Sequence, residues 1–359
     1  MYKPRFAAPR PPATGIVRPG RAFDGYPARA FDAGVGAGSY AFVLAQLALI
    51  DPKIVEPLQA VTHPRDIPIK LGGGFPTDIT AWSTNYATPG VNGLGIQGTS
   101  NTEIPEVQAD VSQGSWKVLN WAHAMTIGYL DIQRLDTARR SGMPPPISLQ
   151  ELYEKGLQTI WNKALDYNTY FGFNGLPGLV NNPYVPEVSA LTGSAGHTPW
   201  STKTFVEILN DFNYALNIAI SNSGYDIQRG MPTHCLIPWS QYALLTQPAT
   251  LSGVGSGFNS ILDYVEAKCI ANVAKGSFKI DPLPNNWLSG QGAGSPATDR
   301  AVFYRNDDDN VKLYIPTAMR QGMTMPTARA GGAYETIFNG CFSQVAWLRT
   351  TTAVYLDAI

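Results

Sequence analysis

Charged residues are scarce in this chain of 359 residues, at 15% of the total, and they nearly cancel to a formal net charge of −1. No global field therefore draws the chain to nucleic acid or to a membrane surface. A surface with so few charges is typical of a protein that other molecules cover, and the 44% hydrophobic content agrees with large, permanent interfaces. The 35 glycines and 28 prolines indicate extended and turn structure rather than a helical bundle.

Cysteines and long hydrophobic runs are also rare. The three cysteines, Cys235, Cys269 and Cys341, are far apart and form no CxxC pair, so neither a disulfide framework nor a zinc site is indicated. We expect them to be buried free thiols. The best apolar run, residues 41–50, is about half a membrane span and lies behind proline-rich sequence, too far along the chain for a signal peptide. These absences predict an intracellular, soluble protein with no membrane partner.

Catalytic motifs are absent as well, since the sequence contains no GxSxG, P-loop or HExxH pattern. Residues 34–38 are glycine-rich but lack the preceding strand and the spacing of a dinucleotide fingerprint. His234 and Cys235 are neighbours, yet adjacent side chains on a strand point to opposite faces and cannot pair as base and nucleophile. The acidic run 306–310 lacks the spacing of a calcium loop and is interpreted as a turn between strands. We therefore predict no catalytic, cofactor-binding or metal-binding residues, and no enzyme.

The charges that are present are unevenly distributed. Residues 1–30 hold six prolines, six basic residues and one acid, a local charge of +5, whereas residues 71–116 hold no lysine or arginine and carry −4. The first composition is typical of an unstructured tail; if it is ordered, we expect a neighbouring copy to order it. We predict inter-subunit contacts between the two segments, formed by Arg10, Arg18 and Arg21 with Asp78, Glu103, Glu106 and Asp110. The alternative is a tail that faces DNA, because basic segments attract phosphate nonspecifically.

Alternating apolar residues predict a long hairpin whose strands flank a glycine-rich tip at residues 89–95. The hairpin has too little apolar surface to stand alone, so we expect it to lie on another subunit. The elements expected in this half of the chain are a helix at 39–50, strands at 79–86, 106–111 and 116–125, and a helix at 127–140.

The longest amphipathic helix is predicted over residues 147–172, with Ser148 and Glu151 as a capping box and Gly172 as the stop. Its length would be roughly 35–40 Å. Polar residues, among them Asp166, are expected on the face opposite an apolar stripe. The stripe consists of Leu149, Leu152, Tyr153, Gly156, Leu157, Ile160, Trp161, Ala164 and Leu165.

A second α/β unit is expected to follow, opened by a capping box of Thr204 and Glu207. The segment 334–355 is strand-like and should return to pack under the long helix. The elements between are predicted as helices at 205–220, 239–245 and 258–273, a buried strand at 233–237, and strands at 278–282, 301–305 and 311–315 that complete a mixed sheet.

This order of elements resembles the major capsid protein of tailed bacteriophages, the Hong Kong 97-type coat fold, over nearly the whole chain. Short motifs carry the resemblance, and each is similar to a family segment: Ala41–Leu47 followed by Asp51-Pro52, Arg65–Ile69, Ile104–Val107, Phe171–Pro183 and Ala353–Ile359.

The resemblance implies an α+β fold with five parts. These are an N-terminal arm at 1–71, an extended β-hairpin loop at 72–126, a peripheral domain with the long spine helix at 127–180, an α/β axial domain at 181–330, and C-terminal strands at 331–359 that return to the peripheral domain.

The function implied is that of a coat protein which assembles through pentamers and hexamers into the icosahedral head around phage DNA. The partners implied are further copies of the chain, portal and scaffold proteins, decoration proteins, and packaged DNA held nonspecifically on the inner face. The location implied is the virion capsid, assembled in the host bacterial cytoplasm. About forty residues precede the arm helix, so we expect a separate scaffold protein. Only Lys117 near the hairpin base could weld neighbours covalently, and we expect no such bond.

Two alternatives compete with this interpretation. An encapsulin-like nanocompartment shell shares the fold but holds cargo enzymes instead of DNA. An α/β enzyme is the more remote alternative, because the sequence offers no recognisable active site.

Overall fold

The computed structural model describes residues 60–87, 107–140, 149–248, 260–275, 277–284, 286–293, 297–322, 327–329 and 333–359. The predicted arm helix at 39–50, the hairpin tip at 89–95 and the Ser148 cap lie outside these residues. The chain divides into two compact units, residues 1–57 and 58–359, and the account below concerns the second. Among its described helices, none is long and apolar enough to cross a lipid bilayer.

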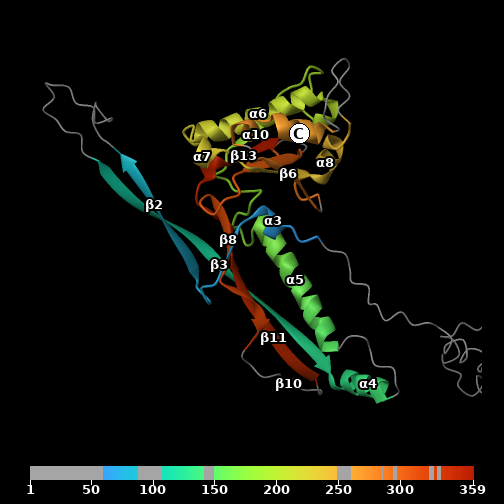
Figure 1. Cartoon of the computed structure of the whole chain (residues 1–359). Coiled ribbons are helices and arrows are strands. Elements are labelled where there is room, and N and C mark those ends of the chain that lie inside the picture. The colour runs from blue at the N-terminus through green and yellow to red at the C-terminus, as the bar shows by residue number, and fades with distance from the viewer. Residues whose placement is uncertain are drawn as a thin grey trace, which may run out of the picture. The chain divides into compact units, whose positions relative to one another are not determined.

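The first described half contains the hairpin and the long helix (Figure 1). Its elements are α3 (His63–Asp66), β1 (Ile69–Leu71), β2 (Asp78–Ala87), β3 (Gln108–Gly128), α4 (Tyr129–Arg140) and α5 (Leu149–Phe171). The hairpin is confirmed, since β2 and β3 pair antiparallel over ten residues from Asp78↔Lys117 to Ala87↔Gln108.

The two strands predicted at 106–111 and 116–125 are a single strand, β3, of 21 residues. The prediction of two separate strands is therefore wrong. Gly114 lies between the two predicted strands. In the structure it pairs with Ala81 of β2, and the Trp116 ring lies where a side chain at position 114 would be. The ladder to β2 on one side, and to β11 (Ala333–Ser343) further along, keeps this strand extended.

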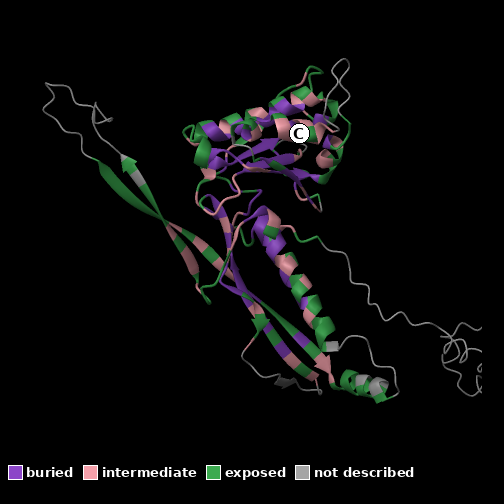
Figure 2. Ribbon diagram, viewed as in Figure 1, coloured by how far each residue is buried: buried purple, intermediate pink, exposed green. Residues whose placement is uncertain are grey.

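The long helix α5 is confirmed with 23 residues, a length of about 35 Å. It ends at Gly172, whose φ of +74° is a left-handed conformation. Leu157, Trp161 and Leu165 of the predicted stripe are buried, whereas Leu152, Tyr153 and Ile160 are more than 40% exposed. Burial is concentrated toward the C-terminal half of the helix (Figure 2).

The remaining elements build most of the sheet structure. They are β4 (Glu187–Ser189), a 3-10 turn (Trp200–Thr202), α6 (Phe205–Asn222), α7 (Ile227–Gly230), β5 (His234–Pro238), α8 (Trp239–Leu245), α9 (Ile261–Lys268), α10 (Ile270–Lys275), β6 (Lys279–Leu283), β7 (Arg300–Tyr304), β8 (Val311–Ile315), β9 (Thr317–Gln321), β10 (Thr327–Arg329), β12 (Ala346–Trp347), a second 3-10 turn (Thr350–Thr352) and β13 (Val354–Asp357).

Three sheets result from these strands. A five-stranded sheet has the order β4-β13-β7-β5-β6, a second has the path β10-β11-β3-β2 with β9 paired to β11, and a small sheet has the order β1-β8-β12. The first sheet is mixed, because β5 and β6 run parallel while β7 is antiparallel to both β5 and β13.

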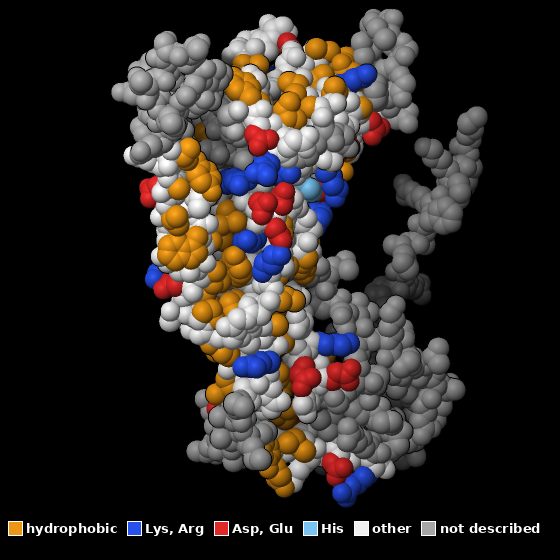
Figure 3. Space-filling view, turned by 60° about the vertical axis from the view of Figure 1, so that its left-hand side comes forward, with side chains coloured by type: hydrophobic (Ala, Val, Ile, Leu, Met, Phe, Trp, Pro, Cys, Tyr) orange, Lys and Arg blue, Asp and Glu red, His pale blue; other side chains and the backbone are white. Residues whose placement is uncertain are grey.

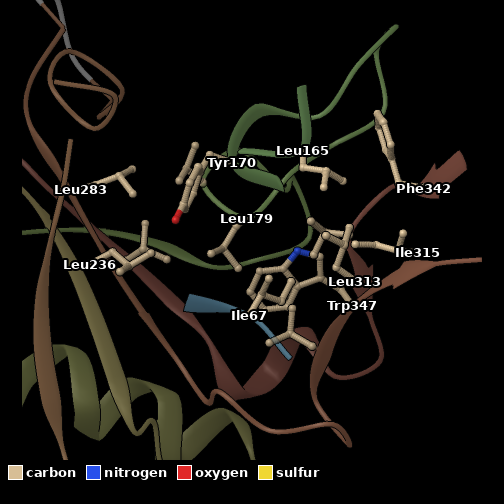
Figure 4. Close-up of a cluster of buried hydrophobic side chains, with 14 of the residues drawn as sticks. Ile67, Leu165, Tyr170, Leu179, Leu236, Leu283, Leu313, Ile315, Phe342 and Trp347 are labelled. Atoms are coloured by element: carbon tan, nitrogen blue, oxygen red, sulfur yellow. The ribbon is translucent and has the colours of Figure 1, made fainter. Parts of the chain in front are cut away.

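The five-stranded sheet is buried on both faces, and alternate residues of its strands enter different cores. Phe303 and Leu356 belong to one hydrophobic cluster with α6, α8 and α9, while Val302 and Tyr355 belong to the other. The cluster that contains Val302 and Tyr355 also includes Leu165 and the labelled residues of Figure 4, and it extends to the end of α5. Because successive side chains of a strand point to opposite faces, this one sheet contributes to both hydrophobic cores.

Several predicted elements of this half are confirmed, including the Thr204–Glu207 capping box of α6 and the short helix α8. The prediction of a single helix at 258–273 is wrong. The structure has two helices there, α9 and α10, because Cys269 between them is extended (ψ 149°). Asn213 of α6 accepts a hydrogen bond from the Ile270 amide (2.9 Å), so a tertiary contact starts the second helix.

The prediction that the strands at 301–305 and 311–315 complete one mixed sheet is wrong, because β7 belongs to the five-stranded sheet and β8 to the small one. β8 pairs with β1 on one edge and with β12 on the other, which leaves no edge for β7. The acidic segment between the strands is a turn, as predicted.

The C-terminal strands divide between two sheets. β11 pairs with β3 and packs on α5, as predicted for the strand-like segment that begins at residue 334. By contrast, β13 pairs with β7 and β4 in the five-stranded sheet, and its Tyr355 shares a hydrophobic cluster with Leu165 and Tyr170 of α5. The alternation of Val354 and Leu356 against Tyr355 lets this strand serve both clusters.

Candidate assembly interface

The hairpin β2–β3 exposes large apolar side chains on one of its faces. Because partners in register share a face, Trp82 and Tyr86 lie on the same side as Val111. Trp82 is 68% exposed and Tyr86 is 74% exposed, values that a monomer rarely combines on one strand. Figure 3 shows hydrophobic side chains over much of the viewed surface, with charged side chains in several groups, the largest of them near the middle of the view. Such a patch indicates an interaction surface.

The opposite face of the hairpin is polar toward the tip, whereas Ile79 and Trp116 lie on it near the base. Ser83 and Ser112 face each other there, with their hydroxyl oxygens 2.5 Å apart. Asp110, which is opposite Asn85 in register, lies on this same face. The hairpin therefore has an apolar and a polar side, and only the apolar side offers the burial that favours permanent association.

The predicted inter-subunit acids do not form one surface. Asp78 lies on the apolar side at the hairpin base, where its carboxylate pairs with Lys117 at 2.8 Å, whereas Asp110 lies on the polar side. Glu103, Glu106, Arg10, Arg18 and Arg21 lie outside the described residues. The structure thus brings Asp78 to a lysine of its own hairpin, and the predicted contacts with the arginines stay a prediction.

A buried polar cluster that sequence reasoning missed fixes residues 62–67 to the end of α5. Asp166, expected on the outer face of the helix, is 2% exposed and accepts hydrogen bonds from the His63 amide (3.0 Å) and the Thr62 amide (3.3 Å). The His63 imidazole lies 2.5 Å from the same carboxylate. A buried carboxylate needs such donors, so the segment that carries them is held firmly at this helix end.

The same segment also bonds to the five-stranded sheet. The Tyr170 hydroxyl donates to the Asp66 carboxylate (2.5 Å), and the Tyr304 hydroxyl of β7 donates to the Asp66 carbonyl oxygen (2.5 Å). Burial raises the pKa of both tyrosines, so both stay neutral donors.

Arg65 completes this cluster. Its guanidinium contacts the Asp66 carboxylate (2.5 Å) and donates to the Pro282 carbonyl oxygen of β6 (3.1 Å). Burial alone would lower the pKa of Arg65, but the hydrogen bond and charge of Asp66 outweigh it and leave the pKa raised. Residues 62–67 therefore join α5, β6 and β7 through a buried polar network.

A second buried ion pair fixes the strand β13. The Arg300 guanidinium binds the Asp357 carboxylate through two nitrogens, at 2.7 and 3.0 Å, and reaches Glu187 of β4 at 2.8 Å. The same guanidinium stacks 4.5 Å above the Tyr355 ring. Bidentate geometry makes this pair rigid, which fixes three strands at one sheet edge.

Among the described residues, no three His, Cys, Asp or Glu side chains gather in a way that could hold a metal ion. His234 contacts the Thr233 hydroxyl (3.0 Å), while burial raises the pKa of the neighbouring Cys235 thiol and keeps it protonated. All three cysteines are buried and free, as predicted.

Known proteins similar to this chain are coat proteins. A family model described as "Major capsid protein" matches residues 94–359. No curated protein sequence matches the chain. Among solved structures, the capsid of Myoviridae phage XM1 is similar with a TM-score of 0.65 and 13% identity, over 88% of this chain and 98% of that one.

Two further capsids agree. The capsid of an empty GTA particle has a TM-score of 0.56 and 9% identity over 90% of this chain and 98% of that one. The capsid of cyanophage P-SCSP1u has a TM-score of 0.52 and 12% identity over 87% of this chain and 93% of that one. These likenesses confirm the predicted Hong Kong 97-type fold.

Proposed function

This chain belongs to the major capsid protein family, and from that premise we propose how its surfaces build a shell. It is a coat protein of the phage head, so its place is the virion capsid, its partners include further copies of itself, and its role is structural rather than enzymatic. The family match does not favour the nanocompartment alternative or the enzyme alternative.

The observation that carries the proposal is the uncovered apolar side of the hairpin. Trp82, Tyr86 and Val111 are each more than half exposed, and among the described elements the main contact of β2 is its partner strand β3. Large apolar surfaces of this kind are stable in water only when another surface covers them. We infer that the hairpin lies on a neighbouring copy, as the extended loop of the shell.

We further propose that copies associate through pentamers and hexamers, because closed symmetry repeats each contact around a shell. The five parts predicted from the sequence, from the arm at 1–71 to the strands at 331–359, would then act as arm, loop, peripheral domain, axial domain and returning strands. Portal, scaffold and decoration proteins, and DNA on the inner face, are the further partners proposed, with assembly in the host cytoplasm.

The basic arm is proposed to strengthen contacts between copies. Arg10, Arg18 and Arg21 would lie along acids of neighbouring loops, with Asp110 as an exposed acid and Asp78 contributing less because Lys117 already neutralises it. Replacing the three arginines by alanine should weaken assembly, more so at low salt. Unchanged assembly of the triple variant would contradict this contact.

The experiment that tests the coat function is assembly of the purified chain. Sedimentation velocity over a range of concentrations should show a threshold above which particles form, and electron microscopy should show closed shells. A chain that stays monomeric at every concentration, with and without a scaffold protein, would refute the proposal.

A further inference from the structure

A groove with aromatic walls lies at the C-terminal end of α5. It encloses about 570 Å³, and its lining includes Tyr167, Phe171, Phe173, Pro177, Asn181 and Pro183. Tyr167 and Phe173 are each 52% exposed, although both are large aromatic side chains. No lining residue carries a formal charge, so an occupant should be bound by apolar contact and by hydrogen bonds from neutral groups.

The groove is rigid. The Tyr167 and Phe171 rings, one helical turn apart, have centroids 5.4 Å apart, and Trp287 supports Phe171 edge-on at 5.8 Å. The Asn181 side chain holds the loop by donating to the Phe171 carbonyl oxygen (2.8 Å) and accepting from the Gly178 amide (2.7 Å). A preformed groove loses little conformational entropy when it binds a ligand.

Aromatic grooves of this chemistry suit proline-rich chains. Such a chain adopts the left-handed polyproline helix at low entropic cost, stacks its rings between aromatic side chains, and presents carbonyl oxygens to neutral donors. The Tyr167 hydroxyl and the amide of exposed Asn174 are donors of that kind.

The chain itself carries a matching segment near its start. Pro9-Arg10-Pro11-Pro12 has the PxxP spacing of chains that form a polyproline helix. Further prolines, Pro4 and Pro19, lie on either side of it, and residues 4–19 contain no acidic residue. Forty-seven residues separate Pro12 from Ala60, where the described chain begins, and a chain can extend up to about 3.3–3.6 Å per residue. This length of chain does not confine the proline-rich segment to its own subunit.

We propose that the groove at the end of α5 binds the proline-rich segment 4–19 of a second copy. The inference rests on the proposed coat function and specifies where the arm docks. It differs from the charge contact proposed above, because the prolines and the aromatic walls, rather than the arginines, provide the affinity.

Binding can be measured with a fluorescent peptide of residues 1–20 and the full chain carrying Pro9→Ala and Pro12→Ala, which keeps its own arm from competing. We expect saturable binding by anisotropy, weakened roughly tenfold or more by Tyr167→Ala or Phe173→Ala, the loss typical of an aromatic anchor. Tyr153→Ala, on the same helix and similarly exposed, is the matched control and should bind normally.

Peptide variants separate the two uses of the arm. A Pro9→Ala, Pro12→Ala peptide should lose binding, while an Arg10→Ala peptide should keep it in both low and high salt. Equal binding of the proline variant, loss with Arg10→Ala alone, or equally tight binding of a peptide of residues 141–148, which holds the other proline run, would overturn the assignment.

Mixed assembly tests whether the docking is between copies. Chains with the Tyr167→Ala groove and chains with the Pro9→Ala, Pro12→Ala arm should assemble better together than either does alone, because one kind offers an arm and the other a groove. A mixture no better than its components would overturn docking on a second copy. Failure of the wild-type chain to assemble would instead refute the coat function.

Discussion

Replacing Trp82 by alanine should raise the protein concentration needed for assembly without unfolding the subunit. Trp82 is 68% exposed in the isolated chain, so its ring contributes little to the stability of the subunit. If a neighbouring copy covers the ring, its loss removes burial from every copy in the shell.

The magnitude follows from the exposed area. A tryptophan side chain has roughly 200 Å² to bury, so its exposed part is about 140 Å² and corresponds to about 3.5 kcal/mol when fully covered, at ~25 cal/mol per Å². Covering is rarely complete, so a loss of about 2 kcal/mol per contact, or roughly thirtyfold in association, is the expected effect.

The assay is light scattering against concentration, with electron microscopy of the products. Trp82→Phe should retain most of the effect because it retains an aromatic ring, and Ser83→Ala on the polar side of the same strand should assemble as the wild type does. Thermal unfolding of unassembled Trp82→Ala should match that of the wild type. An unchanged assembly threshold in Trp82→Ala would refute the role given to the apolar side.

Three further predictions concern the subunit. Trp161→Ala removes a ring that is 3% exposed and should lower the free energy of unfolding by about 3–5 kcal/mol in urea titrations; a loss below about 1 kcal/mol would show that this core is not tightly packed. Gly172→Ala should cost more than about 1 kcal/mol, because its Cβ would lie 1.8 Å from the Leu176 carbonyl oxygen at a φ of +74°. Gly156→Ala, in open space on the same helix, is the control and should stabilise slightly; equal effects at both positions would contradict the strain argument. Hydrogen bonds from the Thr204 and Ser194 amides lower the pKa of Glu207 from 4.5 to about 2. A lowered folded-state pKa stabilises above the unfolded value, so this contribution should be lost as the pH falls from 4.5 toward 2. The difference in melting temperature between wild type and Glu207→Gln should shrink over that range, and a constant difference would contradict it.

The sequence predicted those elements whose signals are local. The period of α5 and the stop at Gly172 needed only the helix itself, and the Thr204–Glu207 capping box marked the start of α6. The coat fold could be predicted because these local elements occur in a family order.

Tertiary contacts decided the rest. The strands predicted at 106–111 and 116–125 form one strand, because β3 pairs with β2 over its first half and with β11 over its second. Asn213 divides the predicted helix at 258–273, although it is more than 50 residues away in the chain. The hydrophobic periodicity of a segment gives no information on contacts with residues so far away in the chain.

The candidate interface shows the same limit. The count of charges correctly marked residues 71–116 as acidic, but a count carries no strand register. Only the register places Asp78 beside Lys117 and puts Asp110 on the other face. Similarly, Asp166 read as a solvent-facing residue because its partners, His63 and Thr62, lie about a hundred positions earlier.

The alternation of β7 between two clusters makes that strand unusually intolerant of a change in length. Deleting one residue ahead of Val302 would turn Phe303 and Tyr304 toward the wrong sides, exchanging the contents of two interiors at once. A strand with only one buried face would lose a single set of contacts after the same deletion. In this chain, insertions and deletions should therefore accumulate in the turns that flank β7 and be excluded from its five residues.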